Sequence, residues 1–168
     1  MKIAVITSHQ RGEIDRLITQ AANDLQADGV KLSGIVKVPD AGKDRSCACE
    51  MAVRVLPDGE VIPITQDLGE GSDACKLDPG AIARAVVEVE KQPLDGVEMF
   101  ILNKFGPEEA RGRGFCGAIA AALAEDIPVL VGVSGPSRAA FDSFVDNLAE
   151  AVAPEPQAIR EWCAQALG

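Results

Sequence analysis

The chain is poor in aromatic side chains and in positive charge. Only 4% of its 168 residues are aromatic and tyrosine is absent, so a surface that stacks nucleic-acid bases is not expected. Lysine and arginine number 16 against 26 aspartates and glutamates, which leaves a formal net charge of −10. Binding of nucleic acid or of an anionic membrane by a whole face needs the opposite balance. Any anion site must therefore be a local basic pocket.

Signals for export and for membrane insertion are also lacking. No apolar run approaches the roughly 18 residues of a membrane span. The apolar segment at residues 3–6 is too short for the core of a signal peptide. The five cysteines are odd in number, which favours free thiols over a disulfide framework. We therefore expect a cytoplasmic protein.

Buried apolar runs alternate with amphipathic segments along most of the chain. Strands are expected at residues 3–7, 30–38, 97–103 and 129–133. Helices are expected at residues 13–26, 79–91, 114–125, 137–151 and 156–167. This alternation predicts an α/β fold with three layers, in which helices cover both faces of a mostly parallel, Rossmann-like sheet.

The middle of the chain departs from this alternation. Two short strand-like runs, residues 51–56 and 61–65, flank Asp58 and Gly59, a strong hairpin signal. Polar loops that carry cysteines lie on either side of the hairpin. We expect one domain over residues 1–168, with the hairpin and the loops, about residues 39–77, as an insertion.

The segment after the first strand has the length of a phosphate-binding P-loop but not its chemistry. Ligands of open parallel sheets bind at the carboxyl ends of the strands, so this loop lies where a site is expected. Thr7 stands in place of the first glycine of the motif, Glu13 in place of its lysine and Ile14 in place of its hydroxyl residue. The loop is either a degenerate P-loop or an ordinary turn in which Glu13 favours the helix N-terminus.

Asn103 and Lys104 end a later strand, where enzymes with such a loop carry an acidic pair. Glu13 and Lys104 thus have the opposite charges to those of the enzyme pattern, and we expect them to pair across the strand ends. The Asn-Lys pair also matches the start of a guanine-binding motif, but Gly106 stands where that motif has aspartate.

The strongest anion signal is the segment of residues 104–115. Arg111 and Arg113 flank Gly112 just before an expected helix, so guanidinium groups and free helix-start amides come together. The alternative is that Glu108 and Glu109 neutralise the arginines in a solvated loop.

The candidate ligand-binding residues are the polar, basic and glycine positions of these segments: Ser8, His9, Arg11, Gly12, Asn103, Lys104, Arg111, Gly112, Arg113 and Gly114. His9, the single histidine, is either a catalytic base or an exposed loop residue. A serine-histidine-aspartate pattern and a nucleophile elbow are both lacking.

The cysteines offer a competing site. Cys47, Cys49 and Cys75 could bring three thiolates to zinc or to a softer metal, although the spacing lacks a C-x-x-C pair and free thiols remain the alternative. Cys116 and Cys163 lie on expected helices and are assigned to the packed core.

Several segments resemble one bacterial family. They are Asn-Lys-Phe-Gly at 103–106, Glu-Ala-Arg-Gly-Arg-Gly-Phe at 109–115, Ile-Pro-Val-Leu-Val-Gly-Val at 127–133, Cys-Glu-Met at 49–51, Gln-Asp-Leu-Gly at 66–69 and Cys-Lys-Leu-Asp-Pro at 75–79. The sequence resembles the domain-of-unknown-function family 2478, whose members are often encoded beside molybdate ABC-transporter genes. That family is in turn similar to small P-loop nucleoside-triphosphatases, which implies a P-loop-like fold and a link to molybdenum.

The sequence therefore predicts a protein that binds a small anionic ligand, a nucleotide or a molybdate-type oxyanion, without hydrolysing it. Lys104, Arg111 and Arg113 would supply charge, Gly12, Gly112 and Gly114 close backbone approach, and Asn103 orientation. The resemblance implies a role in molybdenum homeostasis or cofactor handling, with a homo-oligomer or a molybdenum-pathway protein as partner. The alternatives are a divergent nucleoside-triphosphatase with Glu13 or His9 as base, a thiol-metal module, and an interaction module without a ligand.

Overall fold

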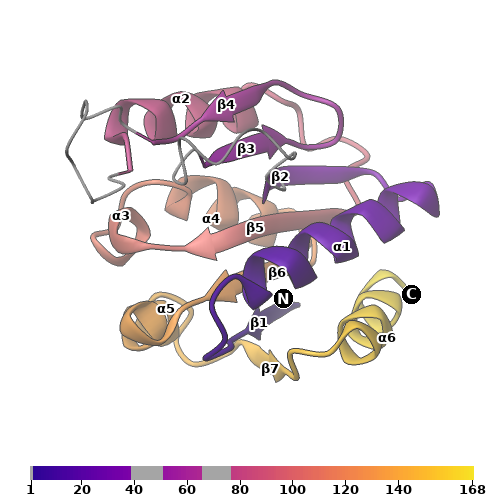
Figure 1. Cartoon of the computed structure of the whole chain (residues 1–168). Coiled ribbons are helices and arrows are strands. Elements are labelled where there is room, and N and C mark those ends of the chain that lie inside the picture. The colour runs from indigo at the N-terminus through magenta and orange to yellow at the C-terminus, as the bar shows by residue number, and fades with distance from the viewer. Residues whose placement is uncertain (1, 39–50, 66–76) are drawn as a thin grey trace, which may run out of the picture.

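The computed structural model describes residues 2–38, 51–65 and 77–168. These residues form a seven-stranded sheet in the order β4-β3-β2-β5-β6-β1-β7 (Figure 1). The strands are β1 (Ile3–Ile6), β2 (Leu32–Lys37), β3 (Ala52–Val55), β4 (Val61–Pro63), β5 (Met99–Phe105), β6 (Val129–Val133) and β7 (Glu150–Val152). β1, β2, β5, β6 and β7 are mutually parallel, and β3 and β4 are antiparallel. The predicted mostly parallel sheet is confirmed.

Helices cover both faces of the sheet (Figure 1). On one face, α1 (Glu13–Ala27) and α6 (Pro156–Leu167) bury their apolar sides. On the other face lie α2 (Pro79–Glu90), α4 (Cys116–Ala124) and α5 (Arg138–Phe144). The short α3 (Pro107–Ala110) follows β5, and the 3-10 turn η1 (Gly135–Ser137) precedes α5. The three-layer α/β fold is thus as predicted.

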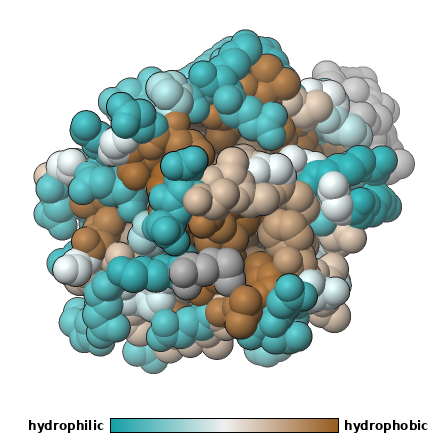
Figure 2. All heavy atoms as spheres, turned by 180° about the vertical axis from the view of Figure 1, so that it is seen from behind, coloured by the Kyte–Doolittle hydropathy of each residue, from teal (hydrophilic) through white to brown (hydrophobic). Residues whose placement is uncertain are grey.

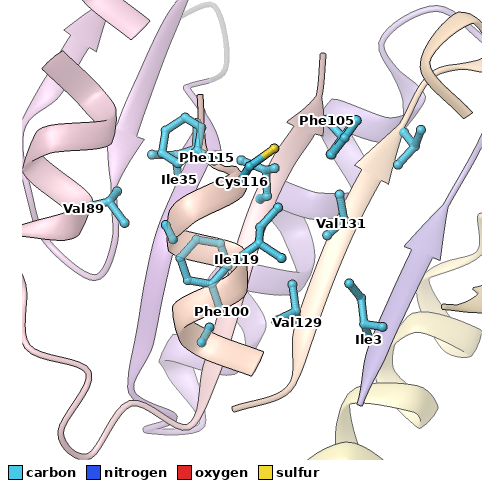
Figure 3. Packing of buried hydrophobic residues seen from close by; sticks show 14 of the residues in the cluster. Ile3, Ile35, Val89, Phe100, Phe105, Phe115, Cys116, Ile119, Val129 and Val131 are labelled. Atoms are coloured by element: carbon cyan, nitrogen blue, oxygen red, sulfur yellow. The ribbon is translucent and has the colours of Figure 1, made fainter. Parts of the chain in front are cut away.

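The larger core cluster lies between the sheet and α4 (Figure 3). Phe100 of β5 and Val129 of β6 are fully buried there together with Ile119 of α4. α4 has no polar side chain in its nine residues, so apolar side chains also gather on the molecule's surface on the face that α2 and α4 cover (Figure 2). No helix in the described part of the chain has the length and apolar content that a membrane crossing requires.

The inserted hairpin is also as predicted. β3 and β4 flank the turn that contains Asp58 and Gly59, and the Val55 N–H donates to the Glu60 carbonyl at 3.0 Å. β3 pairs antiparallel with β2 and so extends the parallel sheet at one edge. The loops with Cys47, Cys49 and Cys75 lie outside the described residues.

The predicted helix over residues 137–151 is wrong in its second half. α5 ends at Phe144, and residues Glu150–Val152 form β7 instead. Asp146 and Asn147 adopt φ values of 50° and 57°, a left-handed conformation that ends a helix and that these residue types tolerate. The chain then pairs β7 with β1, where Val5 lies opposite Ala151. Pairing with a free strand edge outweighs the local helix propensity.

Candidate functional site

The neighbouring strands β1 and β6 send the chain to opposite faces of the sheet. The chain leaves β1 through residues 7–12 and enters α1 on one face, whereas it leaves β6 through η1 and enters α5 on the other. Side by side, these two exits form a topological switch point, the place where open α/β sheets bind ligands. The loop after β5 lies at the same edge, one strand further from β1. The structure thus places all the predicted ligand-binding segments at the carboxyl edge.

The β1–α1 loop presents backbone to solvent at the first turn of α1. Gly12 precedes the helix with φ of 76°, and a Cβ placed there would meet nothing within 4 Å. In the described part of the chain, no side-chain hydrogen bond caps this helix. His9 and Arg11 are exposed beside it. A helix N-terminus and nearby positive charge favour an anion, whereas Glu13 and Asp15 bring negative charge to the same turn.

Glu13 is held within its own loop rather than by Lys104. Its carboxylate accepts a hydrogen bond from the Ser8 hydroxyl and lies 3.8 Å from the Arg16 guanidinium. Lys104 is exposed, and no ion pair joins it to Glu13 among the described residues. The expected Glu13–Lys104 pair is therefore wrong, because local partners five and three residues away satisfy Glu13 first.

Asn103 is bonded within the protein interior and does not face solvent. Its side chain is buried, with the residue 6% exposed. The amide Nδ2 donates to Asp15 Oδ1 at 2.9 Å, and Oδ1 accepts from the Lys37 backbone N–H at 3.2 Å. The Lys37 ammonium in turn lies 3.2 Å from Asp15 Oδ2. Asn103 thus positions α1 and β2 against β5, and its oxygen is already engaged.

A local irregularity near the end of β5 changes the directions in which its last side chains point. The pairing register of β5 against β6 shifts between Leu102 and Phe105. As a result Asn103 is buried toward α1, Lys104 is exposed, and Phe105 returns to the core on the α5 face. Such bulges re-aim side chains next to functional sites. Lys104 is therefore available to a ligand.

The two arginines of the loop after β5 share one carboxylate. Arg111 Nη1 lies 2.9 Å from Glu108 Oε1, and Arg113 Nε lies 3.0 Å from Glu108 Oε2. The expected alternative, that Glu108 and Glu109 neutralise the arginines, is correct for Glu108 and wrong for Glu109, which binds backbone N–H groups instead. Both arginine side chains remain about two-thirds exposed.

Glu109 is a structural residue that sequence analysis did not recognise. It is 6% exposed, and its two carboxylate oxygens accept the backbone N–H groups of Gly106 at 2.9 Å and Phe115 at 3.0 Å. A Cβ at Gly114 would lie 2.0 Å from Glu109 Oε1, so Gly114 is required by this carboxylate. The signal was a glutamate three residues after Gly106, with proline at the first helical position.

The two described thiols are buried, and their pKa values are raised. Burial and the nearby Glu109 carboxylate raise the pKa of Cys116, and burial raises the pKa of Cys163 to about 11. Both are free cysteines in the core, as predicted. The described residues contain no cluster of three histidine, cysteine or acidic side chains arranged to hold a metal, and the three cysteines of the predicted metal site lie outside them.

A groove lies between α1 and α6, away from the carboxyl edge. Leu17, Asp24 and Ile159 are among the residues that line it, and Arg160 crosses it to Asp24 at 2.9 Å. The groove runs along α1 from Leu17 onward, whereas the candidate site lies at the start of this helix. The groove is therefore separate from the candidate site.

The sequence is similar to those of known proteins. A family model described as "Protein of unknown function (DUF2478)" matches residues 3–162. The molybdenum import ATP-binding protein ModC 2 of Bradyrhizobium diazoefficiens is 34% identical over 163 residues, and the match covers 96% of this chain and 18% of that protein. The chain thus spans less than a fifth of this relative's length.

The sheet and its helices also match a solved structure, that of a human cancer-related nucleoside triphosphatase. The TM-score is 0.58 at 15% sequence identity, and the match covers 91% of this chain and 87% of the human chain. At this identity the likeness concerns the fold alone, and the predicted P-loop-like fold is confirmed.

Proposed function

The chain belongs to the family of proteins of unknown function DUF2478, and from this premise we propose that it binds a nucleotide or a related small oxyanion without hydrolysing it. The observation that carries the proposal is the switch point between β1 and β6, where the exposed Gly12 leads into the first turn of α1 at the carboxyl edge of the sheet. The nucleoside-triphosphatase fold and the similarity to a protein named as ATP-binding support it.

The charges at this edge suit an anion. His9, Arg11 and Lys104 are exposed there on a chain whose formal net charge is −10. β5 and β1 are separated by β6 alone, so the loops that follow them start about 10 Å apart. That separation is within the reach of one phosphorylated ligand. The backbone of residues 11–14 would bind the anionic group, and Lys104 would contribute charge from the neighbouring loop.

The residues that hydrolysis needs are replaced. Glu13 stands where a P-loop lysine would meet the phosphates, and its carboxylate turns back to Ser8. Ile14 is buried and has no hydroxyl for magnesium. Asn103 has its oxygen engaged with Lys37. These residues do not fit a magnesium ion at the usual position, which supports binding without turnover.

A role in molybdenum import or homeostasis is part of the proposal. It is supported by the similarity to a segment of a molybdenum import ATP-binding protein. On this view the chain works in the cytoplasm, its ligand is a nucleotide or a molybdate-type oxyanion, and its partner is a second copy or a protein of the molybdenum pathway.

The experiment compares the two glycines that flank α1, which share a left-handed backbone conformation. Gly12 and Gly29 have φ of 76° and 83°, and a Cβ at either meets nothing within 4 Å. Gly12→Ala and Gly29→Ala should therefore lose similar stability, about 1 kcal/mol each. Only Gly12→Ala places a methyl group where the ligand approaches. Titration calorimetry with ATP, GTP and molybdate, each with and without magnesium, should show at least a tenfold weaker affinity for Gly12→Ala alone.

Equal affinities of the two variants would remove the site from the first turn of α1. Phosphate release that depends on magnesium in the wild-type protein would instead establish the alternative, a divergent nucleoside-triphosphatase. Lack of binding to every anion would overturn the proposed function.

A further inference from the structure

Two guanidinium groups converge on a single carboxylate after β5. Arg111 reaches one oxygen of Glu108 and Arg113 reaches the other, at 2.9 and 3.0 Å. The carboxylate is enclosed more than its partners are, with 26% of the Glu108 side chain exposed against 63% and 64% for the arginines. The pair therefore forms a two-sided cradle with Glu108 at its centre.

The loop backbone that carries the two arginines does not depend on the Glu108 side chain. The N–H groups of Arg111 and Arg113 both donate to the Glu108 carbonyl, at 3.1 and 3.0 Å. Glu109 fixes the two ends of the loop through Gly106 and Phe115. The backbone positions of both arginines are thus set by main-chain contacts and by a different carboxylate. If the Glu108 side chain moves away, the Cα atoms of the two arginines keep their spacing and the guanidinium groups are free to bind another anion.

Glu108 leaves much of the donor capacity of the cradle unused. Each guanidinium has five N–H donors in a planar fork, and each is bonded to Glu108 through one nitrogen. A carboxylate brings one negative charge and two oxygens. A tetrahedral dianion brings two charges and four oxygens, and arginine forks bind such oxyanions through paired, charge-assisted hydrogen bonds.

We infer that a doubly charged tetrahedral oxyanion binds between Arg111 and Arg113 at the place that the Glu108 carboxylate now holds. Glu108 is then an internal competitor, which lowers the affinity for every anion that binds there. The inference rests on the proposed function, because it names the anionic group that the loop after β5 recognises. That group is either a nucleotide phosphate or a free oxyanion, and the test separates the two.

The test compares Glu108→Gln with Glu88→Gln in the full chain. Glu88 is also partly exposed and is paired three residues along α2 with Lys91, at 2.8 Å, so both variants gain one unit of positive charge. The affinity of each variant is measured by titration with inorganic phosphate, with molybdate and with ATP. Glu108→Gln should bind inorganic phosphate about tenfold more tightly than wild type, since one charge-assisted competitor is lost. Glu88→Gln should match wild type.

A second pair of variants tests the arginines. When Arg111→Gln and Arg113→Gln are both added to Glu108→Gln, the gain in phosphate affinity should be abolished. Arg84→Gln with Arg160→Gln removes two ion-paired arginines of similar exposure elsewhere and should leave the gain intact. The four arginine side chains are mostly exposed, and circular dichroism of each variant checks that the fold is retained.

The outcomes separate the inference from the proposed function. Equal affinities of Glu108→Gln and Glu88→Gln for all three ligands overturn the inference, even if wild type binds ATP at the first turn of α1. A gain for phosphate and molybdate together with no binding of ATP by any variant upholds the cradle as a free-oxyanion site and removes the nucleotide. If Glu108→Gln gains affinity for ATP and Gly12→Ala abolishes that gain, the cradle and the switch-point site bind the same ligand.

Discussion

Asn103 at the end of β5 donates a hydrogen bond to Asp15 in the first turn of α1, across 2.9 Å of space and 88 residues of sequence. The same amide accepts from the Lys37 backbone, and the Lys37 ammonium returns to Asp15. Three segments at the carboxyl edge are thus tied into one hydrogen-bonded cluster. The edge that carries the candidate site is fixed from inside the molecule.

The Asn103 contact predicts a specific loss of stability. Asn103→Asp replaces the amide donor by a carboxylate that faces the carboxylate of Asp15, and we expect a loss of about 2–3 kcal/mol in the free energy of unfolding. Asn23→Asp makes the same chemical change at an exposed position, where Asn23 accepts from the Arg54 guanidinium at 3.0 Å. Urea denaturation should show no loss for this control. Similar losses in both variants would mean that the Asp15 contact contributes nothing specific.

Gly132 of β6 allows α1 to approach the sheet. A Cβ at this position would lie 2.4 Å from Ile14 Cγ2 and 2.3 Å from the Asn103 carbonyl oxygen. Gly132→Ala should therefore lower the free energy of unfolding by about 3 kcal/mol. Gly135→Ala, just beyond the strand, meets nothing within 4 Å and should leave stability unchanged or raise it by up to about 1 kcal/mol. Thermal and urea unfolding of both variants provide the measurement, and a neutral Gly132→Ala would contradict the close approach.

The two hydrogen bonds of Glu109 predict that its substitution lowers the free energy of unfolding and loosens both ends of its loop. In Glu109→Gln the amide keeps one acceptor oxygen, so the N–H of Gly106 or that of Phe115 loses its partner. We expect a cost of about 1–3 kcal/mol and faster amide hydrogen exchange at both positions. Glu98→Gln is the control, because the exposed Glu98 accepts a single bond, from the Lys31 N–H at 2.9 Å. Its cost should stay below about 0.5 kcal/mol; equal costs would show that burial of Glu109 adds nothing.

Cys163 predicts a loss of stability at alkaline pH. Burial raises the pKa of this thiol from 9.0 in model compounds to about 11 in the folded protein. Above pH 9 the unfolded chain releases the proton while the folded chain keeps it, so this contribution is complete below pH 9 and is lost as the pH rises toward 11. The loss should be on the order of 2 kcal/mol.

The measurement is urea denaturation at several values between pH 8 and 11 in wild type and in Cys163→Ala. The variant starts from a lower stability because it leaves a small cavity, but its decline over this range should be shallower. Parallel declines would refute the assignment to Cys163.

Much of the fold follows from local pattern. The apolar runs at β1 and β6, the amphipathic α1 and the Asp58–Gly59 turn each contain their own signal, because helix and strand periodicity and turn chemistry act within a few residues. The pairing of Glu108 with Arg111 is of the same kind, since the two lie three residues apart on one turn of chain.

The errors share one cause. The apolar pattern of residues 137–151 predicts a helix to residue 151, yet the chain turns at Asp146 and pairs β7 with the free edge of β1. Glu13 was expected to meet Lys104, yet Ser8 and Arg16 bind it. In each case the deciding neighbour depends on the relative placement of segments, which local propensity does not encode.

The sequence by itself determined the order of strands and helices apart from α3 and β7, together with the parallel sheet, and it predicted the candidate site at the carboxyl edge. Tertiary structure alone decided that β6 lies between β1 and β5, that Asn103 is bonded to Asp15 and Lys37, and that Lys104 is free to face solvent. The physical reason is the distance along the chain over which each effect acts, since periodicity and turn chemistry act between near neighbours in the sequence. Burial and hydrogen-bond satisfaction at the edge are settled between residues that only the folded sheet brings together.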